Sequence, residues 1–275
     1  MSLNTFLEIT KDTKVRIWNE FEDGYGVGYL DDIGPGLYLV NYNNLTARRL
    51  PDEYQKTQMY WCSPTVGGLD DSGMIMVNVM GEVPLSGYHD CSGASGMWGW
   101  IDKDFNVVIE PQFIFAYPFG EDGRAIVCRG TWTEKNGGYW SYDEQWGVID
   151  TVGREVVPCV WDDQIHFGDA DENYIVVKDG HYDNNRVWHH GIWNVIEIET
   201  GNVVFASDQE KTGDYLRYSG VEHGYLTITT EDCEKEYLYD LENKKYLFKD
   251  KSYETVIPLG RDKFKIDGCV MTFPT

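Results

Sequence analysis

The residue types best suited to recognition gather in three stretches of the chain. These are residues 81–97, 130–145 and 179–192, and each combines aromatic with ionisable side chains. Aromatic residues are enriched where proteins bind partners, and they also pack the arms of β-hairpins together. We therefore predict a binding surface, with hairpin packing as the alternative. The candidate binding residues are Tyr88, His89, Trp132, Tyr139, Trp140, Tyr182, Trp188 and His189.

The histidines in these stretches do not form a metal-binding pattern. His189 and His190 are neighbours in the chain. On a strand they point to opposite faces and cannot bind one ion together. A zinc site would require His181 or His89 as a further ligand. We expect neither a metal site nor another cofactor.

Motifs of established catalytic chemistry are absent from the sequence. It contains no GxSxG, HExxH or GxxxxGK[ST] pattern. Residues 169–173 resemble the start of a calcium loop, but Tyr174 stands where that loop needs glycine. Carboxylate pairs such as Asp162 and Asp163 carry little information in a chain with 46 acidic residues. The sequence favours a non-enzymatic protein, with carbohydrate binding or glycoside hydrolysis as the alternative.

The charge balance limits the classes of partner. The 46 acidic residues face only 23 basic ones, which gives a formal net charge of −23. Such a surface repels nucleic acid and anionic membranes. It keeps the protein dispersed or attracts a basic partner. We predict a protein or peptide partner, and one alternative is that the chain is an acidic immunity-type antagonist of a basic bacterial toxin.

The cysteines and apolar runs indicate a compartment. None of the six cysteines is in a CxxC pair, and residues 1–10 contain no long apolar segment. No apolar run reaches the roughly 18 residues of a membrane helix. We expect free thiols in the cytoplasm and no membrane partner. The oligomeric state stays open.

A five-residue phrase recurs along the chain. It reads WGWID at 98–102, WGVID at 146–150 and WNVIE at 193–197, at intervals of 48 and 47 residues. A fixed period of this length is typical of repeat architectures. A turn rich in Gly, Asn or Asp and a Val-rich strand follow each copy, so each unit predicts strand, turn and strand. A second phrase, FGED at 119–122 and FGD at 167–169, precedes apolar strands at 124–127 and 174–177.

At this point the chain resembles the WG-repeat family. That family's unit is W-G-V-I-D, a glycine turn, a V-I-P strand, then F-x-x-G and an apolar strand. Residues 98–127 and 146–177 match closely, whereas the third copy has Asn194 for the glycine and Phe205 for the proline. The resemblance implies a β-rich repeat scaffold, often bacterial and usually of unassigned role.

The period also predicts the domain organisation. We expect one β-repeat domain over residues 1–275. Its best-preserved repeats are 98–145 and 146–192, and its degenerate repeats are 20–97 and 193–275. The expected fold is all-β and β-propeller-like with about five units, and an open spiral of stacked β-hairpins is the alternative.

Two further expectations concern the repeated residues. Trp98, Trp146 and Trp193 occupy equivalent positions and should pack in the core. Asp102 and Asp150 end the phrase before a turn, so they should cap that turn through backbone N–H groups. The three long stretches fall at one point of successive repeats, and insertions of this kind project from one face that often binds partners.

Overall fold

The computed structural model describes residues 6–17, 24–55, 72–79, 96–135, 138–161, 173–178, 181–182, 188–189, 193–207, 216–230 and 234–273. Within these ranges the side chains of residues 17, 134–135, 138–140, 178, 181–182, 188–189, 216–219 and 230 are not described. The chain forms two compact units, Met1–Glu155 and Val156–Thr275.

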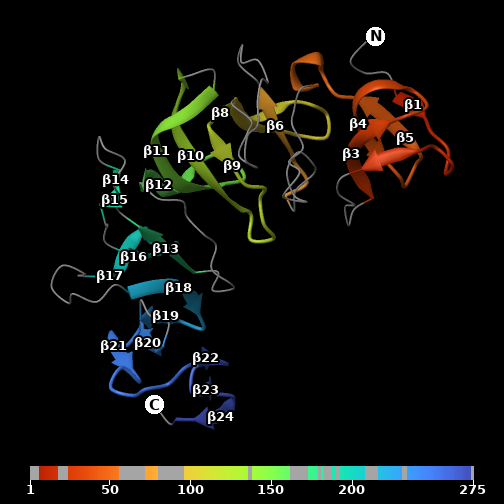
Figure 1. The fold of residues 1–275 in the computed structure, drawn as a ribbon. Coiled ribbons are helices and arrows are strands. Elements are labelled where there is room, and N and C mark those ends of the chain that lie inside the picture. Colours follow the sequence, from red (N-terminus) through yellow and green to blue (C-terminus); the bar gives the residue numbers. More distant parts are fainter. Residues whose placement is uncertain are drawn as a thin grey trace. The chain divides into compact units, whose positions relative to one another are not determined.

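The described residues form strands throughout, apart from the short 3-10 helix η1 (Asp52–Tyr54). An N-terminal sheet has the order β1-β5-β4-β3-β2. Its strands are β1 (Phe6–Glu8), β2 (Val15–Ile17), β3 (Tyr25–Leu30), β4 (Gly34–Asn41) and β5 (Thr46–Arg49). Figure 1 follows the strands along the chain, from red β1 to blue β24.

Two sheets of consecutive antiparallel strands follow. The first is β6-β7-β8 and the second is β12-β11-β10-β9. The strands of the first are β6 (Ile75–Val79), β7 (Met97–Ile101) and β8 (Val107–Phe113). The strands of the second are β9 (Phe115–Ala116), β10 (Arg124–Lys135), β11 (Gly138–Asp150) and β12 (Glu155–Trp161).

The remaining residues form three more such sheets and one short ribbon. The orders are β13-β16-β17, β18-β19-β20-β21 and β22-β23-β24, with β14-β15 as the ribbon. The strands of the first and of the ribbon are β13 (Tyr174–Lys178), β14 (His181–Tyr182), β15 (Trp188–His189), β16 (Trp193–Glu197) and β17 (Asn202–Ala206). The others are β18 (Leu216–Glu222), β19 (Tyr225–Thr230), β20 (Glu236–Asp240), β21 (Lys245–Leu247), β22 (Val256–Pro258), β23 (Lys263–Ile266) and β24 (Cys269–Thr272).

This arrangement confirms the all-β repeat fold. After the N-terminal sheet, five sheets succeed one another from β6 to β24, and each is built from strands close in sequence. Antiparallel meanders of this kind are the units of propeller-like folds. The number agrees with the expectation of about five units.

The register of the strands repeats as the sequence does. An apolar strand pairs with the Trp-bearing strand so that Val77 lies opposite Gly99 and Val127 opposite Gly147. Val177 lies opposite Asn194 in the third copy. Gly99 is required by close packing, since a Cβ atom there would come within 2.5 Å of the Ile109 carbonyl oxygen. The sequence period is therefore a period of strand pairing.

The tryptophans of the repeated phrase lie in the core, as predicted. Trp98 and Trp146 are buried and Trp193 is half-buried. Trp100 is fully buried, and its ring centroid lies 5.0 Å from that of Phe119. Burial of rings this large is a main source of core stability. These residues therefore belong to the scaffold.

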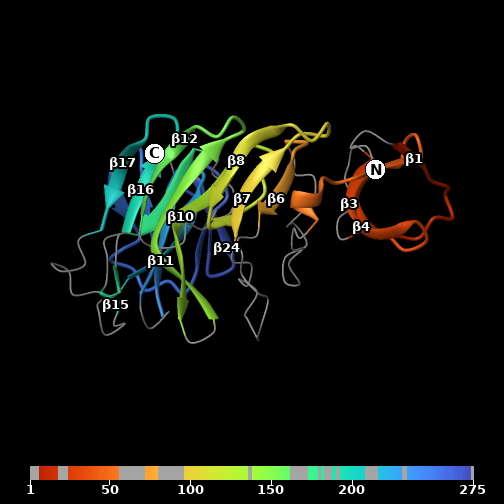
Figure 2. The same cartoon turned by 90° about the horizontal axis from the view of Figure 1, so that it is seen from above.

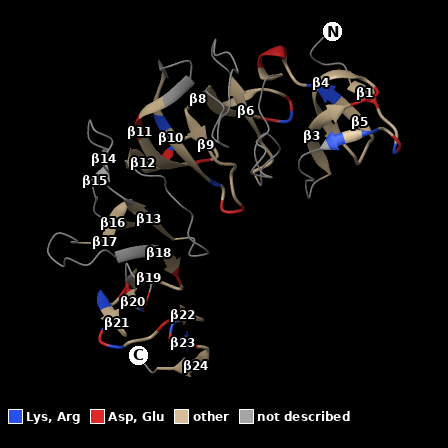
Figure 3. Ribbon diagram, in the orientation of Figure 1, with Lys and Arg blue, Asp and Glu red and all other residues tan. Residues whose placement is uncertain are grey.

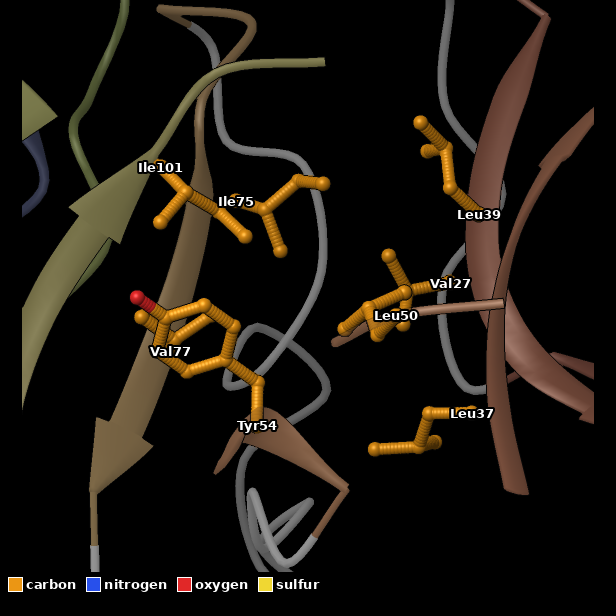
Figure 4. Close-up of a cluster of buried hydrophobic side chains, with 8 residues drawn as sticks. All are labelled: Val27, Leu37, Leu39, Leu50, Tyr54, Ile75, Val77 and Ile101. Carbon is orange, nitrogen blue, oxygen red and sulfur yellow. The ribbon is translucent and has the colours of Figure 1, made fainter. Parts of the chain in front are cut away.

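The N-terminal sheet packs its apolar face against the sheet that follows it. Figure 4 shows the side chains of β3 and β4 facing those of β6 and β7. The cluster comprises Val27, Leu37, Leu39, Leu50, Tyr54, Ile75, Val77 and Ile101, all buried. An end repeat needs its exposed face covered. The N-terminal sheet does this for the first repeat.

A buried cation adds a polar contact to this apolar interface. The Arg48 guanidinium donates to the Lys103 carbonyl at 3.2 Å and to Asp104 Oδ1 at 3.3 Å. It also lies 4.2 Å from the centroid of the Phe105 ring. Phe105 has φ of 67°, a left-handed conformation that is unfavourable for a large side chain. Its contact with Arg48 and the neighbouring core offsets this cost.

Candidate functional site: the insertion end of the repeat sheets

The connections between strands differ sharply between the two ends of the first three repeat sheets. Tight turns join the Trp-bearing strand to the strand after it at residues 102–106, 150–154 and 197–202, and a similar turn at 240–245 follows β20, which has no tryptophan. The long insertions join the apolar strand to the Trp-bearing strand, between β6 and β7, within β10–β11, and between β13 and β16. In an antiparallel sheet these two connections lie at opposite ends. We call them the turn end and the insertion end.

The turn end is built by one repeated carboxylate. Asp102 Oδ1 accepts hydrogen bonds from the backbone N–H groups of Asp104 and Asn106, both at 2.8 Å. Asp150 Oδ1 accepts from the backbone N–H groups of Val152 and Arg154. The capping role predicted for both aspartates is confirmed.

A related turn, in which the aspartate accepts from the backbone N–H three residues on, occurs at a position with little sequence similarity to the phrase. Asp240 Oδ1 accepts from the Asn243 backbone N–H at 2.9 Å, and its Oδ2 accepts from the Asn243 amide group at 2.8 Å. The fourth turn therefore repeats the chemistry of the first two.

The electrostatics of the turn carboxylates are those of structural groups. Partial burial acts to raise the pKa of Asp102. Hydrogen bonds from Asn106 and Asp104 and the charge of Arg48 outweigh it, so this pKa lies below its usual value. Burial also acts to raise the pKa of Asp150. Hydrogen bonds from Arg154 and Val152 and the charge of Arg154 outweigh it, so this pKa also lies below its usual value. Both remain acceptors at neutral pH.

Other shifted pKa values in the described residues have similar local causes. The Asp52 pKa is lowered by its hydrogen bond with Arg49. Burial raises the pKa of several tyrosines, namely Tyr54, Tyr117, Tyr225, Tyr239 and Tyr246. Perturbed groups mark catalytic sites when they converge in a cleft. Here each shift follows from a turn, an ion pair or core packing, which suits a scaffold.

The insertion end is best described in the ribbon made by the far parts of β10 and β11. Beyond Gly130 the two strands pair with each other, from Thr131 opposite Tyr142 to Lys135 opposite Gly138. Figure 2 shows this ribbon extending past the rest of its sheet. An isolated two-stranded ribbon is marginally stable in water, so its base must be fixed by other contacts.

Trp132 supplies one of those contacts. Its indole Nε1 donates to the Gly96 carbonyl oxygen at 2.9 Å, and its ring meets Phe115 edge-on at 5.4 Å. Phe115 in turn stacks on Trp146 at 5.7 Å. Gly96 directly precedes β7, so the bases of the first two insertions touch. Trp132 was predicted as a binding residue, and its described contacts are those of a packing residue.

The base of the ribbon also contains a backbone irregularity. The register shifts between Arg129 and Thr131, and Asp143 on the facing strand has φ of 53°. A Cβ atom on Gly130 would come within 2.8 Å of the Tyr142 carbonyl oxygen. Bulges of this kind redirect a strand. This one lies where the ribbon leaves the sheet.

The other predicted binding residues are placed only in part. Tyr139 and Trp140 pair with Glu134 and Thr133, so these consecutive positions belong to opposite faces of the ribbon. Tyr182, Trp188 and His189 lie on the β14–β15 ribbon, where Tyr182 is opposite Trp188. Their side chains, and residues 88 and 89 altogether, lie outside what is described.

The described residues can be searched for metal ligands and for a membrane-spanning helix. His181 pairs with His189 across the β14–β15 ribbon. No group of three His, Cys, Asp or Glu residues capable of holding a metal occurs among residues with described side chains. The calcium-like acids at 169–172 lie outside the described ranges. The described part of the chain contains no helix long and apolar enough to cross a membrane. Cys128 and Cys159 are buried.

Several residues that shape this region carry no sequence signal of their own. Arg48 and Phe105 join the N-terminal sheet to the first repeat turn, and Gly96 and Phe115 receive Trp132. Each contact joins separate elements, so no local pattern reveals it. The only signal in the sequence is the repeat period, which suggests that the strands preceding two successive insertions are neighbours.

The chain resembles one known family of sequence repeats. The sequence model described as "WG containing repeat" matches residues 98–130 and 146–180, about a quarter of the chain. No curated protein sequence matches the chain significantly.

Solved structures with similar features are distant from this chain. One is an oligogalacturonate lyase in complex with manganese, with 12% identity over 82% of this chain and 61% of that one, and a TM-score of 0.36. The chain thus spans less than two thirds of that protein. Another is apo AztD from Citrobacter koseri, with 10% identity, coverage of 82% and 69%, and a TM-score of 0.28. A third is Sqt1 from Saccharomyces cerevisiae, with 9% identity, coverage of 94% and 82%, and a TM-score of 0.24.

The family match coincides with the two repeats in which the Trp-bearing strand, the glycine opposite valine and the aspartate-capped turn are all present. The resemblance read from the phrase is thereby confirmed: the chain carries WG-containing repeats at residues 98–130 and 146–180.

Proposed function

We propose that the protein is a non-enzymatic scaffold that binds a protein or peptide partner through the insertion end of its repeat sheets. The observation that supports this most is the contrast between the two ends. An aspartate that accepts from backbone N–H groups recurs at the turn end, whereas each insertion has its own length and composition. Regular scaffolds that present variable loops at one end are a common way to build a binding surface.

The contact between the first two insertions adds to this proposal. Trp132 holds the base of one against Gly96 at the end of the other. This contact fixes the base of the second insertion against the start of β7. Ordered bases also lower the entropy lost when a partner binds. Trp140 and Trp188, farther along the insertions, are the residues we propose for contact.

Crosslinking from the two ends of the sheets tests the proposal. A photo-crosslinking amino acid replaces Trp140 or Trp188 at the insertion end, or Val152 at the turn end. Val152 is 72% exposed and serves as the matched control. We expect one crosslinked partner from positions 140 and 188 and none from 152.

The captured partner then permits a quantitative test. We expect the affinity for the purified partner to fall about a hundredfold in the Trp140→Ala/Trp188→Ala variant, as for buried aromatic anchors, and to stay unchanged in Val152→Ala. If the folded double variant binds the partner with unchanged affinity, the insertion end is not the binding surface.

The net charge of −23 supports a basic partner in the cytoplasm, such as a basic toxin. Attraction between opposite charges accelerates association and weakens as salt rises. We expect the association rate to fall at least tenfold between 50 and 500 mM salt. A rate that does not depend on salt argues against a basic partner while leaving the insertion-end surface standing.

A further inference from the structure

The β-bulge at the base of the β10–β11 ribbon decides which way one carboxylate points. The register shifts beside Gly130, so that two residues of β11, Asp143 and Glu144, face this one residue of β10. On a regular strand Ser141 and Glu144, three positions apart, would point to opposite faces. The extra residue brings them to the same face, where the Ser141 hydroxyl donates to Glu144 Oε1.

The face that Glu144 reaches is aromatic. Trp146 Nε1 donates to Glu144 Oε2 at 3.3 Å. The Trp146 ring stacks on Phe115, and Phe115 meets Trp132 edge-on. Trp132 lies opposite Ser141 in the ribbon. Phe115, Trp132 and Glu144 are each only half-buried, so a carboxylate and two aromatic rings share one partly open face.

Glu144 differs in its partners from other carboxylates of the first compact unit. Three partly buried carboxylates of this unit each pair with an arginine, and they belong to Asp122, Asp150 and Glu155. Among the residues that the structure describes, Glu144 accepts only from the neutral Ser141 hydroxyl and Trp146 indole. A carboxylate offers about four acceptor positions, and a partly buried charge is most stable beside an opposite one. Glu144 therefore keeps both acceptor capacity and an unbalanced charge for a cation.

A guanidinium group fits this combination better than a metal ion does. Calcium and magnesium take six or more oxygen ligands, whereas one carboxylate beside aromatic rings offers few. The guanidinium group of arginine is planar, donates two parallel hydrogen bonds to a carboxylate and stacks on aromatic rings. A cation beside Trp or Phe also gains from the charge distribution of the ring. The chemistry of the face therefore favours arginine.

The charge of the whole chain acts in the same direction. Its net charge of −23 attracts basic segments from a distance. Figure 3 shows both signs of charge on the described strands, with Lys and Arg in blue and Asp and Glu in red. General attraction of this kind does not select one basic group over another. Selection needs a defined site, and Glu144 with its rings provides one.

We propose that Glu144, with the rings of Trp132 and Phe115 beside it, binds an arginine side chain of the partner protein. This inference rests on the proposed function, because it names the chemical group that the insertion end recognises. The guanidinium group donates two hydrogen bonds to the Glu144 carboxylate while its plane lies against the rings. The bulge is then the device that holds the carboxylate on the aromatic face.

Two peptides of equal charge test the chemistry on the unaltered protein. One is a fluorescein-labelled peptide of alternating glycine and arginine, and the other has lysine in place of arginine. We expect the arginine peptide to bind the full-length protein in fluorescence anisotropy at about 150 mM salt, where distant charges are largely screened. The lysine peptide should bind about fivefold more weakly, because it lacks the planar fork. Absence of arginine-peptide binding, or equal binding of the two peptides, overturns the proposal.

Substitutions locate the binding. Glu144→Gln should weaken the arginine peptide about tenfold, because it removes the charge and keeps the size of the side chain. Glu121→Gln is the matched control, since it removes the same charge from an exposed turn of the same unit, and it should leave binding unchanged. Equal loss in both variants, or in neither, overturns the site. The comparison of the two peptides remains decisive if Glu144→Gln disturbs the ribbon.

The results also separate this site from the proposed function. A partner crosslinked from position 140, together with equal binding of the two peptides, would keep the insertion-end surface and overturn the arginine site. Arginine-selective binding that depends on Glu144, without a crosslinked partner from positions 140 and 188, would support the site and remove those two tryptophans from the surface.

Discussion

The two ends of the repeat sheets follow different rules. At the turn end Asp102 and Asp150 repeat one arrangement of hydrogen bonds with backbone N–H groups, and Asp240 caps its turn through the N–H of Asn243. At the insertion end the ribbon of β10 and β11 and the short ribbon of β14 and β15 share only their place in the sheet. The structural requirements of the fold lie in the repeated end, which leaves the other end open to variation for binding.

The strand that joins the two ends should be the least tolerant of change. In Gly99→Ala the added Cβ atom meets the Ile109 carbonyl oxygen and the Pro111 backbone within 3 Å. We expect a loss of about 3 kcal/mol in the free energy of unfolding, measured by urea titration with tryptophan fluorescence. Gly201→Ala, where no atom lies within 4 Å, should cost only about 1 kcal/mol for its φ of 69°. Equal costs would mean that Gly99 is not held by close packing.

The turn end comes next in size. Asp102→Ala removes the acceptor for two backbone N–H groups and for the Asn106 amide. We expect a loss of about 2 kcal/mol in unfolding free energy, because each hydrogen bond contributes about 1 kcal/mol and water replaces part of them. Asp32→Ala, an exposed aspartate outside the repeat turns, should change stability by less than about 0.5 kcal/mol. A similar loss in both variants would show a general effect of charge.

The difference between the two ends also explains what the sequence could predict. The phrase predicted the repeat, the core tryptophans and the capping aspartates, because each depends on local pattern and register. The contact of Trp132 with Gly96 joins residues 36 apart, and the docking of Arg48 on residues 103–105 joins residues more than 50 apart. Tertiary contacts of this kind leave no periodic trace. The aromatic character of Trp132 was visible, and packing was the stated alternative to binding, but its contact partners Gly96 and Phe115 were not predictable.

Acid should weaken the turn end selectively. The pKa values of Asp102 and Asp150 lie below their usual value in the folded protein. A group with a lowered folded pKa contributes stability above its unfolded pKa of about 3.9 and loses it as pH falls through the folded pKa. We expect unfolding free energy to drop as pH falls below about 5. The Asp102→Asn/Asp150→Asn variant should show a shallower drop, whereas an identical profile would assign the acid sensitivity to other carboxyl groups.

The smallest effect on global stability should come from the insertion end. Trp132→Ala removes the hydrogen bond with Gly96 and the ring contact with Phe115. The half-buried ring fixes the base of a ribbon that is itself outside the core. We expect a global loss of about 1 kcal/mol and a larger local change, seen as faster amide exchange at Thr131 and Thr133. Trp132→Phe should retain the ring contact without the hydrogen bond, so its loss of unfolding free energy should be smaller than that of Trp132→Ala.

If exchange in the ribbon is unaltered by Trp132→Ala, the ribbon is held by other contacts and the two insertions are independent. In that case the proposed surface divides into separate binding elements, and the turn end remains the only end of the sheets with a common design.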